Sequence, residues 1–282
     1  MIRRQITIAW RVLKITGETF FQNHGFFLAM GLAFNLLLYF IPLGLLLISL
    51  LGYTFLDSER AMVEVHSLTR QFLPHSEQRF AENFKSIISH RGLLGLVGFC
   101  FFLVFSSTLF GSVRHVLNIV FRAQKKRTFL RGLLRDLFMM LITALLLLLS
   151  IGAGGLLALA RTIGVERLPL IAPMVEMVWG FTGKLISLGL LTGLFYVFYR
   201  YAPARSLSRS ATVVASLSAT ILFEFARWGF TWYVGFARET LTLYGALGGL
   251  MFFFFWLYYA SVVFVLGAEV GFAYEQIRLA EA

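Results

Sequence analysis

Residues 246–273 read ALGGLMFFFFWLYYASVVFVLGAEVGFA, an apolar run that contains a single charged residue, Glu269. A helix needs only about 20 apolar residues to cross a hydrocarbon core of roughly 30 Å. The aromatic part of the run, MFFFFWLYY (251–259), lacks the polar–apolar alternation of a membrane β-strand. Because backbone groups inside a bilayer must hydrogen-bond within their own segment, the run predicts a transmembrane α-helix.

The rest of the chain carries the same pattern. Of its 282 residues, 59% are hydrophobic and 14% are charged, whereas soluble domains carry about 25% charged residues. The fold class is therefore predicted to be all-α: a polytopic membrane bundle of about six transmembrane helices with additional interfacial amphipathic helices. The expected spans are 26–56, 93–113, 133–160, 178–199, 211–236 and 246–273.

The expected transmembrane domain, 26–273, is flanked by a cytoplasmic helix (1–25) and a short cytoplasmic tail (274–282). The first segment reads as a basic amphipathic helix that lies on the inner leaflet. Its expected apolar face consists of Ile2, Ile6, Trp10, Leu13 and Phe20. The outer connection, 57–91, reads as two short amphipathic helices separated near Pro74.

The distribution of basic residues predicts the orientation. With the N-terminus inside, the cytoplasmic segments carry fifteen Lys and Arg residues, and the opposite segments carry eight, balanced by eight acidic residues. The positive-inside rule then places both termini in the cytoplasm. The net charge of +11 is interpreted as this topology signal, with anionic lipid headgroups rather than nucleic acid as the partner.

The stretch ATILFEFARWGFTWYVGFA (219–237) places Glu224 and Arg227 inside an otherwise apolar span. Three residues apart, they share a helix face and can pair. Each charge at the centre of a span costs roughly 2.5–3.5 kcal/mol on insertion scales, and pairing lowers that cost without removing it. The pair is expected to face the bundle interior or a wet cavity. Two interpretations stay open: a substrate or proton pathway, and a structural clamp between helices.

Other polar residues within the spans are weaker candidates. Asn35, Tyr39 and Pro42 share one face of the first span, where Pro42 is expected to kink the helix. Asn35 and Tyr39 are expected to line a cavity or to bond across to another helix, and packing is the favoured interpretation. Glu269, near the cytoplasmic end of the last span, is expected to be shallow enough for water to reach it.

Glycines at four-residue spacing indicate sites where helices approach closely. The interpretation favoured for them is packing within the bundle; the alternative is formation of a homo-oligomer. The three pairs are Gly189 with Gly193, Gly245 with Gly249, and Gly267 with Gly271.

Motifs for catalysis and metal binding were not found in the sequence. The single cysteine, Cys100, lies in an apolar run and is expected to be a buried small hydrophobe. The five histidines share no metal-ligand spacing, and neither a GxxxxGK[ST] phosphate loop nor a G-x-S-x-G elbow occurs. We therefore expect no catalytic residue, no metal and no cofactor.

Four segments together resemble the BrkB/YihY family of bacterial inner-membrane proteins. They are GLAFNLLLYFIPL (31–43), YRYAPARS (199–206), ATILFEFARWGF (219–230) and YGALGGLMFFFFWLYYASVVFVLGAEV (244–270). The resemblance implies a multi-pass protein of the inner (plasma) membrane with six helices and both termini cytoplasmic. Family members commonly have an aromatic residue in place of Asn35 and a small residue in place of Tyr39, which argues against a role for either.

The sequence is compatible with three functions. The first is a transporter for a lipid, an ion or a small solute, with Glu224 and Arg227 at its pathway. The second is a non-catalytic envelope scaffold. The third follows from the ribonuclease label that some family members carry; it is the least favoured, because RNA cleavage needs a metal cluster or an acid–base pair that water can reach.

Overall fold

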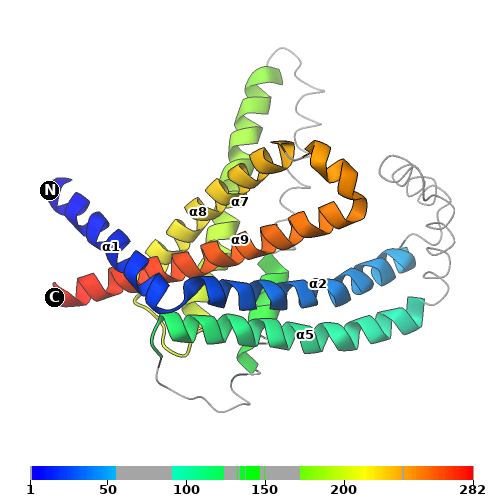
Figure 1. Cartoon of the computed structure of the whole chain (residues 1–282), viewed down its shortest axis with the longest axis horizontal. Helices are drawn as coiled ribbons and strands as arrows, with labels where there is room; N and C mark the ends of the chain where they lie inside the picture. Colours follow the sequence, from blue (N-terminus) through cyan, green and yellow to red (C-terminus); the bar gives the residue numbers. More distant parts are fainter. Residues whose placement is uncertain are drawn as a thin grey trace. The chain divides into compact units, whose positions relative to one another are not determined.

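The computed structural model describes residues 2–54, 91–123, 132, 134–136, 138–146, 149, 172–236 and 238–281. Figure 1 shows the helices in chain order. They are α1 (Ile2–Gln22), α2 (Gly25–Thr54), α5 (Arg91–Val120), α7 (Ala172–Tyr201), α8 (Arg209–Phe236) and α9 (Arg238–Ala280). The described part of the chain contains no strand, which confirms the all-α fold class.

Five of the described helices are long and apolar enough to cross a membrane. Their candidate spans are Gly25–Gly44, Leu96–Val120, Gly180–Tyr201, Arg209–Phe236 and Gly248–Ala280. The expected span 133–160 lies largely outside the described residues, although its described positions up to 149 are helical. The expected outer helices of 57–91 also lie outside them. The described spans confirm a polytopic membrane bundle.

The chain divides into two compact units. Unit 1 comprises Met1–Phe34 and Phe110–Ala282, and unit 2 comprises Asn35–Leu109. In unit 1, α8 packs along both α7 and α9, and α1 packs along α9. With 43 residues, α9 is longer than the about 20 residues that one bilayer crossing needs, and Figure 1 shows that its first part bends sharply.

Small residues set the close approach of α8 and α9. A Cβ atom at Gly267 would lie 2.6 Å from the Cβ of Ala219, and one at Gly271 would lie 2.5 Å from the Cβ of Ala215. Two facing rows of small residues bring helix backbones together in membranes, where packing rather than water exclusion drives association. The pair Gly267 and Gly271 thus lies within the tightest described part of unit 1.

The seam between α7 and α9 is aromatic. Tyr199 is fully buried, and its hydroxyl donates a 2.8 Å hydrogen bond to the carbonyl of Phe264. Phe195 stacks on Tyr199 with ring centroids 5.9 Å apart and also contacts Phe264. A tyrosine in such a seam needs a partner for its hydroxyl, and the Phe264 carbonyl supplies it.

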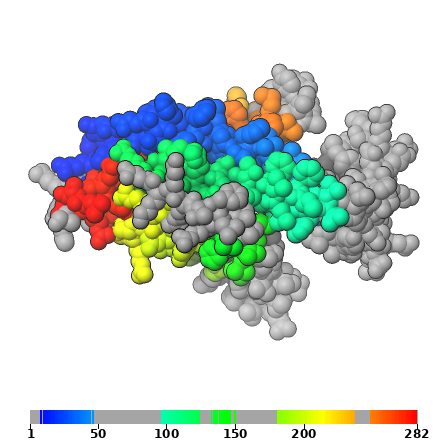
Figure 2. All heavy atoms as spheres, turned by 90° about the horizontal axis from the view of Figure 1, so that it is seen from below, coloured from blue at the N-terminus to red at the C-terminus, as the bar shows by residue number. Residues whose placement is uncertain are grey.

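The first helix packs one of its faces against the end of α9. Val12 packs with Ala273 and Ile277 of α9, and Figure 2 shows the two ends of the chain side by side. Of the expected apolar face, Trp10 is 70% exposed, Leu13 is 62% exposed and Phe20 is buried, and its contact with the inner leaflet stays a prediction. The helix carries two apolar strips, and α9 covers one of them. The side chains of Ile2 and Ile6 lie outside the described residues.

Candidate functional site

The side chains of Glu224 and Arg227 form an ion pair on α8. Arg227 Nη2 lies 2.7 Å from Glu224 Oε2, and the side chains are 53% and 25% exposed for Arg227 and Glu224 respectively. The Thr231 hydroxyl, one turn further on, donates to the Arg227 carbonyl at 2.8 Å. Exposed Phe225 and Trp228 flank the pair. Helix α8 therefore presents a charged pair at the edge of an aromatic surface.

A line of buried hydroxyl groups leads along α8 to this pair. Thr212, Ser216 and Thr220 are buried, and each donates to the carbonyl four residues earlier. Glu224 occupies the next position of this four-residue repeat. Thr192 of α7 contacts the end of the line, with its hydroxyl oxygen 3.0 Å from that of Thr220.

Sequence reasoning missed this hydroxyl line, defined here as Thr212, Ser216 and Thr220. The signal was available: from Ser208 onward, every fourth residue up to Glu224 is polar. Residues at this spacing share one helix face. Their donation to i−4 carbonyls satisfies each hydroxyl locally, so the line places polar oxygen atoms inside a span without leaving them unbonded.

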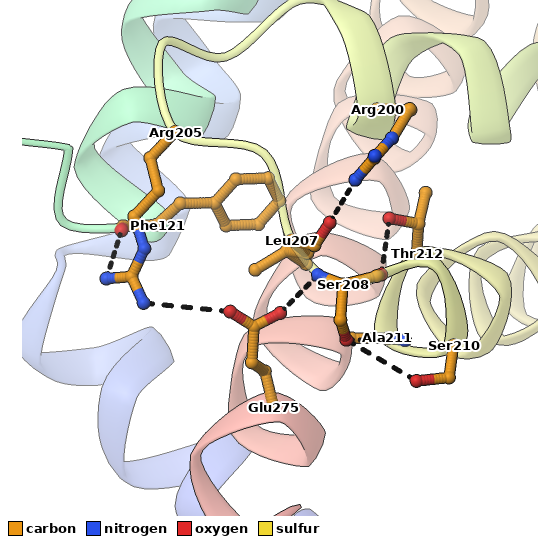
Figure 3. A network of polar contacts seen from close by, with 9 residues as sticks. All are labelled: Phe121, Arg200, Arg205, Leu207, Ser208, Ser210, Ala211, Thr212 and Glu275. Atoms are coloured by element: carbon orange, nitrogen blue, oxygen red, sulfur yellow. Dashed lines mark hydrogen bonds and ion pairs between the residues drawn. The ribbon is translucent and has the colours of Figure 1, made fainter. Parts of the chain in front are cut away.

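At the other end of α8, polar contacts fix the connection from α7 (Figure 3). Glu275 of α9 accepts a 2.6 Å hydrogen bond from the Ser208 amide and lies 3.6 Å from Arg205 Nη2. Arg205 also donates to the Phe121 carbonyl at 3.5 Å, and Arg200 donates to the Leu207 carbonyl. These contacts join α5, α8 and α9 around residues 202–208.

Two further bonds tie the same connection to its surroundings. The Ala204 amide donates to Asn118 Oδ1 at 2.7 Å, and Arg135 donates to the Pro203 carbonyl at 3.0 Å. Backbone groups in an irregular segment need such partners when they are withdrawn from water. Arginine side chains at this end of the molecule thus satisfy backbone carbonyls as well as carrying charge.

A buried ion pair stabilises the start of the expected span 133–160. Arg114 Nη1 of α5 lies 2.8 Å from Asp136 Oδ1, and the side chains are 28% and 8% exposed. Gly132 leaves room for the arginine, because a Cβ atom there would lie 2.8 Å from Arg114 Nη1. Neither Arg114 nor Asp136 stood out in the sequence, since each lies at the edge of an apolar run.

Glu269 is fully buried, with 0% of its surface exposed, so the expectation that water reaches it is wrong. Its Oε1 accepts a 2.7 Å hydrogen bond from Asn23 Nδ2, in the turn between α1 and α2. Its Oε2 has no hydrogen-bond partner among the described residues. Hydropathy predicted the helix that carries Glu269. The burial of Glu269 depends instead on packing against α1, which hydropathy does not encode.

The polar residues of α2 lie in unit 2. Tyr39 is half-buried, and its ring centroid lies 5.4 Å from that of Phe102 on α5. Asn35 is half-buried, and Pro42 is fully buried within a helix that continues to Thr54. The contact with Phe102 favours packing as the role of Tyr39, whereas a kink at Pro42 stays a prediction. Cys100 of α5 is exposed, contrary to the expectation of burial.

The remaining glycines lie in more open surroundings than Gly267 and Gly271. Among the described residues, no atom lies within 4 Å of where a Cβ atom at Gly189, Gly193 or Gly249 would be. The surroundings of Gly245 lie outside the described residues. Among the described residues, no three His, Cys, Asp or Glu side chains converge to hold a metal ion.

Comparisons with known proteins identify relatives along nearly the whole chain. The family model described as "Virulence factor BrkB" matches residues 16–282. A UPF0761 membrane protein of Aliivibrio fischeri is 24% identical over 95% of this chain and 84% of its own length. One from Pseudoalteromonas translucida is 27% identical, covering 76% and 69% respectively. No solved structure matches the chain significantly.

Proposed function

Because the chain belongs to the Virulence factor BrkB family, we propose that this integral membrane protein is a transporter with Glu224 and Arg227 at its pathway. The substrate class is a lipid, an ion or a small solute. The proposed location is the bacterial inner membrane with both termini cytoplasmic and with α1 against anionic headgroups. We also propose that the protein is not an enzyme.

The observation that carries this proposal is the polar route along α8. The hydroxyl line ends at Thr220, and the charged pair begins one turn later at Glu224. Placing a charged residue in the centre of a span costs at least about 2.5–3.5 kcal/mol. Such a residue is therefore disfavoured unless a function or a partner compensates for this cost. A substrate pathway is a function that accounts for a polar stripe of this length.

The contacts of the pair favour a pathway over a clamp between helices. A clamp requires a bond from Glu224 or Arg227 to a neighbouring helix. The described hydrogen bonds of the pair, including the one that the Arg227 carbonyl accepts from Thr231, all stay within α8. More than half of the Arg227 side chain is exposed, which leaves the guanidinium group accessible to an anionic substrate group.

The orientation proposal is supported by the positions of the chain ends. Both termini belong to unit 1, where α1 packs along the C-terminal part of α9. Ends on the same side of a membrane require an even number of crossings, which agrees with the six spans expected from the sequence. The excess of basic residues on that side supports a cytoplasmic location.

Cysteine accessibility tests the pathway. In a Cys100→Ser background, one variant carries Thr231→Cys, on the face of the pair, and its matched control carries Phe225→Cys, on the neighbouring face. Both positions are exposed in the structure. A difference in their labelling by a membrane-impermeant maleimide therefore measures access to water and not burial within the protein. Intact cells and inverted vesicles supply access from the two sides.

We expect labelling at Thr231→Cys, none at Phe225→Cys, and weaker labelling at Thr231→Cys when Glu224→Gln removes the charge. An aqueous route to the pair requires this pattern. Labelling at neither position from either side would contradict the proposal and favour the envelope scaffold. Labelling at both positions would place this part of α8 outside the hydrocarbon core and would also contradict the proposed pathway.

A further inference from the structure

The carboxyl group of Glu269 is buried without a complete set of partners. Asn23 bonds to Oε1 at 2.7 Å, whereas Oε2 is buried and has no hydrogen-bond partner among the described residues. A buried carboxylate that lacks a counter-charge or a full hydrogen-bond set is strongly disfavoured. A proton or a bound cation on Oε2 would satisfy the group.

The neighbours of this carboxyl group come from α1, from the turn after it and from the residues just beyond α5, and among the described residues none donates to Oε2. Thr19 of α1 lies within hydrogen-bonding reach of the carboxyl group, but in the arrangement described here its hydroxyl donates to the Ile15 carbonyl at 2.9 Å. Arg122, just beyond α5, is close enough to interact electrostatically with Glu269. Its guanidinium group, however, lies over the Phe272 ring, 5.5 Å from the centroid. His24, next to Asn23 in the turn, is exposed.

The chemistry of these neighbours distinguishes a proton from a metal ion. A hard metal cation needs about six or more oxygen ligands, as Ca²⁺ does in proteins. Here Asn23 presents its NH₂ group to the carboxyl, and the Thr19 hydroxyl hydrogen is directed at a carbonyl. A proton needs only one oxygen, and Oε2 is that oxygen.

We propose that Glu269 is a proton-binding site: in the arrangement described here it is a neutral carboxylic acid with its proton on Oε2. Arg122 provides the means of release. It occupies a left-handed turn (φ 50°) directly after α5, and its side chain is exposed. When the guanidinium group leaves the Phe272 ring and pairs with Oε2, the proton passes to water and the carboxylate is neutralised by the arginine.

This inference is independent of the transport proposal. It rests on α1, the end of α5 and α9, whereas the proposed pathway rests on the Glu224–Arg227 pair of α8. A failure of the cysteine-accessibility test would leave the protonation of Glu269 unaffected. The reverse also holds, because the accessibility of Thr231 does not depend on the state of Glu269.

Infrared difference spectroscopy of the purified full-length protein in lipid nanodiscs tests the proposal. The carboxylic acid C=O stretch lies outside the amide bands and is absent from carboxylates. The wild type is compared with Glu269→Gln and with Glu18→Gln, which alters an exposed carboxyl paired with Lys14. We expect an acid band at neutral pH that Glu269→Gln abolishes and Glu18→Gln leaves unchanged.

An unchanged spectrum in folded Glu269→Gln would overturn the proposal, because Glu269 would then be a carboxylate. If that variant does not fold, Glu269→Asp keeps the acid but moves it relative to Asn23. The acid band must then shift in frequency, and an unshifted spectrum is the contrary result.

The Arg122→Gln variant tests the role of Arg122 in releasing the proton. We expect this variant to retain the acid band under alkaline conditions that remove the band from the wild type. Loss of the band in both proteins at the same pH contradicts the role of Arg122.

Discussion

A Cβ atom on Gly271 of α9 would lie 2.5 Å from the Cβ of Ala215 on α8 and 3.1 Å from the carbonyl oxygen of Ala211. A flexible side chain could move away from such a contact, but a backbone carbonyl in a packed helix cannot do so without displacing the helix. The distance between α8 and α9 is therefore set by the absence of a side chain at Gly271.

The first prediction concerns this seam. We expect Gly271→Ala to lower the free energy of unfolding by about 1–3 kcal/mol, the usual cost of adding a methyl group to a well-packed interface. Thermal unfolding in detergent, followed by tryptophan fluorescence, measures the effect.

Gly193→Ala on α7 is the matched control for that variant. A Cβ atom at Gly193 would meet no atom of the described residues within 4 Å, and alanine is favoured over glycine in a helix interior by about 0.5–1 kcal/mol. We expect this variant to be neutral or slightly more stable than the wild type. Equal destabilisation by both substitutions would mean that the α8–α9 seam is not specially tight.

The second prediction concerns the ion pair between Arg114 and Asp136. Because Asp136 is buried, we expect Arg114→Met to destabilise the protein by about 3–5 kcal/mol, the range for a buried charge that loses its partner. The double variant with Asp136→Leu removes both charges and should recover much of that loss. The measurement is again the unfolding midpoint of each variant in detergent.

The exposed pair between Lys14 and Glu18, with its atoms 3.9 Å apart, supplies the comparison. Removing Lys14 should cost no more than about 1 kcal/mol, as is usual for surface ion pairs. If Arg114→Met proved as mild as Lys14→Met, Asp136 would have to be solvated, uncharged or neutralised by Arg135, which also acts on it electrostatically.

The transmembrane helices were predictable from the sequence, because the bilayer imposes one simple condition on them. About 20 consecutive apolar residues suffice, and backbone hydrogen bonding then requires a helix. The span that includes Glu224 satisfied this condition despite its two charges. The pairing of Glu224 with Arg227 was equally predictable, since helix geometry alone brings residues three apart together.

Residue environments that depend on contacts between helices were not predictable in the same way. Glu269 was expected to be wet and is buried, because α1 folds back along the end of α9. Val12 of α1, which is not part of the expected apolar face, packs against Ala273 and Ile277 of α9. In both cases the helix carries more than one apolar strip, and only the partner helix determines which strip is covered.

The third prediction concerns the connection between α7 and α8. Glu275 accepts a bond from the Ser208 amide at the start of α8 and contacts Arg205. We expect Glu275→Ala to lower stability by about 1–3 kcal/mol, because the partly buried Ser208 amide then lacks its acceptor. Glu275→Gln keeps an acceptor oxygen for the amide and should lose less. Protease cleavage within 202–208 reports the local opening, and it should increase in the alanine variant more than in the glutamine variant.

Resistance of both Glu275 variants to cleavage would show that the connection is held without this residue. The bonds from Ala204 to Asn118 and from Arg135 to Pro203 would then suffice. An Asn118→Ala variant, which removes the acceptor for the Ala204 amide, distinguishes the contributions of the two ends of the connection.

The fourth prediction concerns the exposed face of α1. Trp10 and Leu13 are exposed there beside Arg11 and Lys14, and the helix is followed after two residues by the candidate span of α2. An exposed apolar strip with basic neighbours next to a span is typical of a helix in the headgroup region. We expect the wild type to unfold at a higher temperature in nanodiscs containing anionic phosphatidylglycerol than in nanodiscs of phosphatidylcholine alone.

Replacing Arg11 and Lys14 by glutamine should remove about 1 kcal/mol of this stabilisation for each charge, whereas Glu18→Gln should not reduce it. Salt at 1 M, where the Debye length is about 3 Å, should abolish the difference between the two lipids for the wild type. A lipid-dependent gain that persists in the double variant at low salt would mean that α1 does not contact anionic headgroups. The headgroup preference would then have to arise from the basic residues at the other helix ends, of which Arg205 and Arg278 are exposed.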